Sequence, residues 1–379
     1  MARIPVAFGI FAAAAILAAP IFASLHQPEE PMAVPVRSDG VGEPLPFEEF
    51  RQRLVTLANI GDPRPTTEGK PNRDRAKVLA RVVAFQQNRK PTPDELAIHC
   101  VDLLRLGNTD PRAGDPGLYV NKAVDLLAPR TRDRVPNYFV HTTLAEVHAA
   151  RGEFREAVEY HEAALIDSEM PATVKGWTEP QRNWIKRLDG DCLPHYLRIR
   201  KAEMEVSARK SPETEEPTPL FPLPVKNKPS EPVRFVNDAG QFEVGSLAKA
   251  EREKLPPDAV AIVQQLLLWF PTDTRLYWLL AELYAADGKL DEAQVIFEQC
   301  TWSRQYGNRK VLMEHRTAVA TAIEARRLAE EQAAIDAYPV SLKAIWVYFG
   351  AVVVIAGFAV MRFFFKRTDK GSIWPSCCR

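Results

Sequence analysis

The spacing of apolar residues along this chain predicts helices over most of its length. Apolar positions recur every three to four residues in 47–60 and 73–88, the period of a helix with one buried face. Thr92 and Glu95 flank Pro93 in the arrangement of a capped helix start. Helical patterns follow one another without intervening strands, so the sequence predicts an all-α fold of short antiparallel helices.

A continuous apolar stretch near the C-terminus breaks this pattern. Residues 344–365 are apolar apart from Arg362, and a basic run begins at Lys366. About 20 apolar residues in a helix match the thickness of the hydrocarbon core of a bilayer. Arg362 is near enough to the basic run to extend toward the headgroups. We therefore expect a transmembrane helix at 344–365 and a cytoplasmic tail at 366–379.

The first 23 residues are typical of a secretory signal. One positive residue, Arg3, precedes a long apolar stretch, and Ala23 offers a small residue at a cleavage point. The stretch is long for a signal peptide, so an uncleaved N-terminal anchor is the alternative. Both interpretations export the region between the two apolar segments. We expect a bacterial cell-membrane protein, single-pass or two-pass if the signal is retained, that lies mostly outside the cytoplasm.

Proline clusters divide the exported region, in a chain with 31 prolines. Residues 24–46 are predicted to form a spacer, and residues 211–232 an extended linker. The linker separates an N-terminal helical region, 47–210, from a C-terminal region, 233–338, that ends in a capping helix. Within the second region, residues 234–247 alternate around a turn and predict a short β-hairpin.

Composition excludes several classes of function. The formal net charge is zero and basic residues are mixed with acidic ones, so no basic stripe indicates nucleic acid. Motifs for nucleotide binding, serine hydrolysis or zinc proteolysis are absent, and we expect neither enzymatic activity nor a cofactor. Cys100, Cys192 and Cys300 lie far apart among apolar neighbours, as buried thiols do.

Residues 138–171 and 274–305 share one pattern of small and large side chains. In each, a leucine–alanine pair precedes a glycine turn, and an alanine follows in the next helix. The matching positions are Leu144, Ala145, Gly152 and Ala157 in the first segment, and Tyr277, Leu280, Ala281, Tyr284, Gly288, Ala293 and Phe297 in the second. At these residues the chain resembles the tetratricopeptide repeat (TPR) family, whose unit of about 34 residues is a pair of helices. The resemblance implies helical hairpins arranged as an irregular α-solenoid.

The resemblance also implies a concave groove for a peptide or an extended partner segment, lined by the first helix of each hairpin. Carried over to this chain, the protein-binding residues are Phe139, Thr142, Glu146, Arg275, Trp278 and Glu282. Arg275 and Trp278 are the strongest candidates, because these residue types dominate the energetics of interfaces. The alternative is that Trp278 packs against Leu267 and Trp269 of the preceding helix.

Three histidines occupy the aromatic positions of the first TPR-like unit. His141 and His148 are seven residues apart and share one face of a helix, while His161 comes from the partner helix. The simpler interpretation is that the imidazoles replace aromatic rings in the hairpin and form local hydrogen bonds. The alternative is a metal-binding or pH-sensitive site, because imidazole binds zinc and copper and titrates near neutral pH.

Together these patterns predict a membrane-anchored TPR-type scaffold or assembly factor. It would bind another protein or an extended peptide at the extracytoplasmic face of a bacterial membrane, and contact the bilayer through 344–365. Two alternatives remain: a metal sensor or metalloenzyme that uses His141, His148 and His161, and a purely structural spacer. Fold alone does not decide among them.

Overall fold

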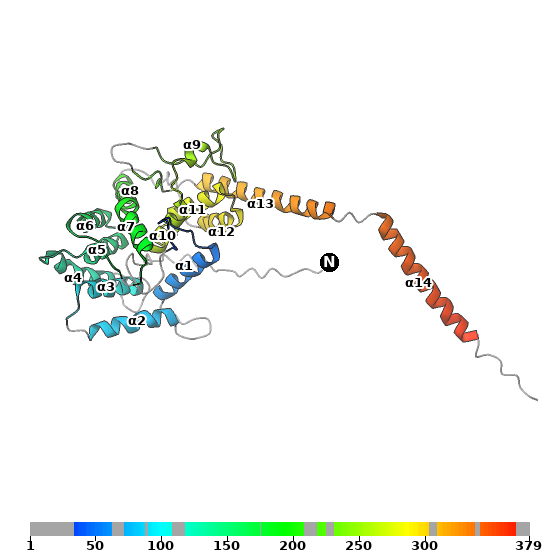
Figure 1. The fold of residues 1–379 in the computed structure, drawn as a ribbon, viewed down its shortest axis with the longest axis horizontal. Coiled ribbons are helices and arrows are strands. Elements are labelled where there is room, and N and C mark those ends of the chain that lie inside the picture. Colours follow the sequence, from blue (N-terminus) through cyan, green and yellow to red (C-terminus); the bar gives the residue numbers. More distant parts are fainter. Residues whose placement is uncertain are drawn as a thin grey trace, which may run out of the picture. The chain divides into compact units, whose positions relative to one another are not determined.

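The structure is a computed structural model that describes residues 34–62, 72–87, 90–107, 118–174, 176–207, 218–224, 231–302, 309–337 and 342–368. The described residues are mainly helical (Figure 1), and extended backbone pairs only in an isolated bridge between Val36 and Gly42. The predicted all-α class is confirmed. The predicted signal at 1–23 and the tail residues 369–379 lie outside the described residues. The chain divides into two compact units, Met1–Ala320 and Thr321–Arg379.

The first unit begins with four helices that pack on one another in sequence. They are α1 (Phe47–Gly61), α2 (Arg73–Gln86), α3 (Pro93–Gly107) and α4 (Leu118–Leu127). The predicted start of α3 is confirmed: the Glu95 amide donates to Thr92 Oγ1 over 3.2 Å, and Glu95 Oε2 accepts from the Thr92 amide over 2.8 Å. Leu96, Cys100 and Leu104 on the inner face of α3 are buried in one core with residues of α4 and α5.

A short 3₁₀ turn (Ala128–Arg132) leads into the first predicted hairpin, formed by α5 (Tyr138–Ala150) and α6 (Phe154–Asp167). Gly152 joins the two helices with a φ of 75°, a conformation that favours glycine. Then follow α7 (Glu179–Arg187), a π-helical turn (Leu188–Cys192) and α8 (Leu193–Ser207), which packs against α6.

The rest of the first unit is built around α10. After the short α9 (Lys249–Arg252) come α10 (Ala259–Trp269), α11 (Thr274–Ala286) and α12 (Leu290–Trp302). The second predicted hairpin is α11 and α12, joined at Gly288 with a φ of 72°. Every residue of α10 is buried, because α11 packs on it and α1 also contacts it. The N-terminal helical region and the C-terminal helical region as far as Ala320 therefore lie within the same compact unit.

Segments rich in proline are partly buried as well. Residues 34–46, here called the N-terminal strap, belong to the predicted spacer, yet Val34 and Leu45 are buried. Leu220 and Phe221, within the predicted linker, are buried too. Apolar side chains between the prolines explain this burial, since removing them from water is favourable.

The β-hairpin predicted at 234–247 is wrong. The described residues there form turns, with the Asn237 amide donating to the Gln241 carbonyl over 2.8 Å. Farther along, the Gly245 amide donates to the Ala285 carbonyl at the end of α11, also over 2.8 Å. The backbone groups of this segment thus bond to turns and to a helix end, where strand pairing was expected.

Two long helices end the described chain, α13 (Arg309–Ala337) and α14 (Leu342–Thr368). Leu312 and Val319 in the first half of α13 are buried, whereas residues 324–336 are exposed. In α14 the side chains are described for residues 346–362, and all of them are exposed. Within the described part of the chain, no helix is long and apolar enough to cross a membrane. This finding does not support the transmembrane helix predicted at 344–365, which stays a prediction.

Burial of His99 in α3 makes the stability of the first unit depend on pH. The imidazole stacks on Phe85 with ring centroids 3.9 Å apart. Burial, helped by the positive charge of Lys122, lowers the pKa of His99 from 6.5 to about 4. The unfolded chain therefore binds more protons at this residue between these pH values, and acidification favours unfolding.

We expect the free energy of unfolding to fall by up to about 3 kcal/mol as the pH is lowered from 6.5 to about 4. Urea denaturation at several pH values would measure this slope in the native chain and in a His99→Phe variant. The His99→Phe variant should lack the part of the pH dependence of the unfolding free energy that His99 contributes. Equal slopes in the two proteins would contradict the assignment.

Candidate functional site

The N-terminal strap is bound to α10 through its backbone. Gln264 holds Leu45 at both polar groups: Gln264 Oε1 accepts from the Leu45 amide over 2.7 Å, and Gln264 Nε2 donates to the Leu45 carbonyl over 3.1 Å. Gln265 Oε1 accepts from the Val34 amide over 2.9 Å. A primary amide carries an acceptor and two donors, so it can satisfy an extended backbone as a neighbouring strand would. Side-chain amides of α10 thus bind backbone groups near both ends of the strap.

Apolar anchors at both ends of the strap complete these contacts. Val34 is 0% exposed and Leu45 is 3% exposed, while five of the ten residues between them are exposed. The second hydrogen of Gln264 Nε2 is also used, since it donates to Tyr284 Oη over 2.8 Å. The amide is therefore oriented by α11 as well as by the strap, and its position is fixed from two sides.

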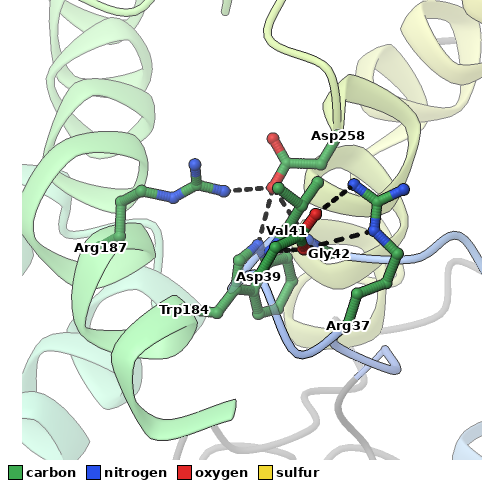
Figure 2. Close-up of polar contacts among 7 residues, drawn as sticks. All are labelled: Arg37, Asp39, Val41, Gly42, Trp184, Arg187 and Asp258. Carbon is green, nitrogen blue, oxygen red and sulfur yellow. Dashed lines mark hydrogen bonds and ion pairs between the residues drawn. The ribbon is translucent and has the colours of Figure 1, made fainter. Parts of the chain in front are cut away.

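Asp258, directly before α10, joins the strap to α7 (Figure 2). Its side chain is fully buried, and Oδ2 accepts from the Gly42 amide over 3.2 Å and from Trp184 Nε1 over 2.8 Å. Arg187 Nη2 forms an ion pair with the same oxygen. Burying a carboxylate is unfavourable unless its charge is paired and its oxygens are hydrogen-bonded. Three segments distant in sequence thus meet at one atom.

Gly42 is required where the strap passes Trp184. A Cβ at position 42 would lie 2.7 Å from Cε2 and Cζ2 of the indole, closer than side chains tolerate. Arg37 and Asp39 pair at 3.0 Å in the turn before it, and Asp39 Oδ1 also accepts from the Val41 amide over 3.1 Å (Figure 2). The amide and then the guanidinium lower the pKa of Asp39. The strap therefore carries its own folded turn.

A second polar layer joins α8 to α11. Tyr196 Oη donates to Asp273 Oδ2 over 2.7 Å, and burial raises the pKa of Tyr196 well above its ordinary value. Arg200 lies 3.6 Å from the same carboxylate oxygen. Arg275 forms an ion pair with Glu203 of α8. Arg275, predicted to contact a partner, thus contacts another helix of its own chain.

Most of the residues predicted to line the groove are buried in the structure. Trp278 is 1% exposed, and its Nε1 donates to Glu282 Oε1 over 2.6 Å. Glu282 is equally buried and accepts from His315 Nδ1 of α13, also over 2.6 Å. The structure therefore brings Trp278 and Glu282 together as core residues beneath α13.

The predicted residues of the first hairpin follow the same trend. Thr142 is fully buried and its hydroxyl donates to the Tyr138 carbonyl over 3.0 Å. Glu146 is buried, and Phe139 is half-buried. The six predicted residues do not form one exposed face. In the second hairpin, Arg275 contacts Glu203 of α8 and Glu282 contacts His315 of α13.

The three histidines point to different partners. His141 Nδ1 donates to the Asn137 carbonyl over 3.0 Å, and His161 Nε2 to the Asp189 carbonyl over 2.8 Å. His148 Nδ1 lies 2.7 Å from Glu153 Oε2. Among the residues that the structure describes, no group of three or more His, Cys, Asp or Glu is arranged to hold a metal ion. The local hydrogen bonds agree with the simpler interpretation, and the geometry gives the metal-site alternative no support.

The strap site was not recognised in the sequence, although one signal for it is present. Gln264 and Gln265 interrupt a helix that is otherwise entirely apolar. Buried amides need hydrogen-bond partners, so two of them in such a helix indicate a polar segment packed against it. The identity of that segment could not be read from local spacing.

Comparisons with models of protein families, with curated proteins and with solved structures gave no match to this chain.

The burial of Trp278 gives a direct test of its role. We expect Trp278→Ala to lower the free energy of unfolding by about 3–5 kcal/mol, as truncation of a buried aromatic ring does. Chemical denaturation would measure the change, with Arg275→Ala, which removes the ion pair with Glu203, as a comparison. A Trp278→Ala protein as stable as the native chain would place the indole on an open surface.

Proposed function

We propose that this protein is a membrane-anchored helical scaffold that binds an extended polypeptide segment outside the cytoplasm. The proposal rests on the hydrogen bonds between the strap and the region of α10. In these bonds the buried amides of Gln264 and Gln265 and the carboxylate of Asp258 bind backbone groups of the strap. Buried polar groups of α10 and of the residue before it thus hold a segment of peptide backbone. Recognition of extended segments through their backbone is a recurring mode of protein binding.

The helical hairpins support the same proposal. The segments that resemble TPR units coincide with α5–α6 and α11–α12, and each turns at a glycine with positive φ. Proteins of the TPR type use stacked hairpins to present binding surfaces. We infer that this chain uses a TPR-type array in which part of the usual groove is filled by α8 and α13.

Membrane attachment through 344–365 is part of the proposal. Side chains at 346–362 of α14 are exposed around the whole helix, among them Trp346, Phe349, Ile355 and Phe358. A helix that is apolar on all sides is unfavourable in water and calls for a bilayer or a partner. A helix over 344–365 would be about 33 Å long, close to the thickness of the hydrocarbon core. The predicted signal at 1–23 would export the first unit.

The membrane part is tested by alkaline extraction of membranes from cells that make the full chain. We expect the native protein to remain in the membrane pellet. Val353→Arg with Ile355→Arg should move it to the supernatant, because each arginine near the centre of a span opposes insertion by about 2.5–3.5 kcal/mol. The matched control is Leu328→Arg with Ile335→Arg on the exposed half of α13, which should stay in the pellet. Extraction of the native chain would contradict the anchor.

The binding part is tested by photo-crosslinking in the same cells. A photoreactive amino acid replaces Ser38, which is exposed on the strap, or Ala84, which is exposed on α2. We expect position 38 to yield a discrete protein adduct that position 84 does not. Identical adducts at both positions, or none at position 38, would contradict a binding role for this face.

A further inference from the structure

The strap contacts α10, α7 and Asp258 in the way that a bound peptide contacts a separate protein. Val34 and Leu45 are the buried anchors, and Gly42 passes under Trp184. The hydrogen bonds to α10 and Asp258 come from strap backbone groups rather than strap side chains. The side chains of Arg37 and Ser38 face solvent. The site therefore contacts the backbone, one glycine and two apolar side chains of the strap.

The site is also supported from outside the strap. If the Gly42 amide left Asp258, the carboxylate would keep the Arg187 ion pair and the Trp184 hydrogen bond. If Leu45 left Gln264, the amide would keep its bond to Tyr284. The receptor groups are therefore held in place by the helices themselves. Pre-organised groups of this kind bind a returning segment at low entropic cost.

We propose that the N-terminal strap, which folds back between Val36 and Gly42, is an intramolecular ligand that blocks a peptide-binding site on α10, α7 and Asp258 until a partner segment displaces it. The partner segment would carry a glycine three residues before a leucine, in the spacing of Gly42 and Leu45, with an apolar residue upstream in the place of Val34. This inference rests on the proposed binding function and adds its regulation. A tethered ligand acts at an effective concentration in the millimolar range, so weakening the strap should open the site to a peptide in solution.

The test uses the full chain and a fluorescent peptide with the sequence of residues 34–46. Gly42→Ala weakens the strap, because the added methyl group meets the Trp184 ring. Leu45→Ala, which removes an anchor, is a second route to the same state if Gly42→Ala fails to fold. Glu43→Ala is the matched control in the same segment, since Glu43 is exposed. Fluorescence anisotropy measures the dissociation constant of each protein.

We expect the peptide to bind the Gly42→Ala or Leu45→Ala protein at least tenfold more tightly than the native chain or Glu43→Ala. Adding Gln264→Leu to the weakened strap should abolish this binding, as should replacing glycine by alanine in the peptide. Failure of the peptide to bind either folded strap variant overturns the inference, and so does equal binding to the native chain. Because partner capture from position 38 is scored separately, a failed inference and a failed binding role give different results.

Discussion

The architecture of the first unit depends on satisfying one buried carboxylate. Asp258 lies where α10 begins, its side chain has no exposed surface, and it must find partners inside the protein. It finds them in Gly42, Trp184 and Arg187, which come from the strap and from α7. Burying the charge alone would be unfavourable by several kcal/mol, so this geometry constrains how the strap and α7 meet α10.

Other buried polar groups between the two helical regions also need hydrogen-bond partners inside the protein. Gln264, Gln265 and Asp273 are buried polar residues at or beside α10 and α11. Each finds a partner in a part of the chain that precedes the predicted linker: the strap for the two amides, and Tyr196 for the carboxylate. An apolar surface alone could dock in several registers, whereas buried polar groups are satisfied in few of them. The polar contacts thus explain why two regions separated by a proline-rich segment form one unit.

Local features of the fold could be predicted from the sequence, and long-range ones could not. The capping box at Thr92 and the glycine turns at Gly152 and Gly288 depend on residues a few positions apart, and the structure has them. The strap contact joins Leu45 to Gln264 across 219 residues, a distance at which periodicity carries no information. The groove residues were placed from a repeat pattern that describes one hairpin at a time. It could not show that Glu203 and His315 would cover Arg275 and Glu282.

Whether the predicted signal is cleaved affects how the strap could leave its site on α10. If the signal is cleaved after residue 23, ten residues (24–33) precede Val34, and the strap is covalently joined to the helices through α1 alone. It can then leave α10 from its free end, one contact at a time. If the segment is retained as an anchor, the strap is tethered at both ends, and leaving α10 removes less of its confinement. The entropy gained on release is smaller for a chain held at two points, so the anchored form would keep its site closed more tightly. Signal cleavage would thus set how readily the peptide site opens, which links export to the proposed binding role.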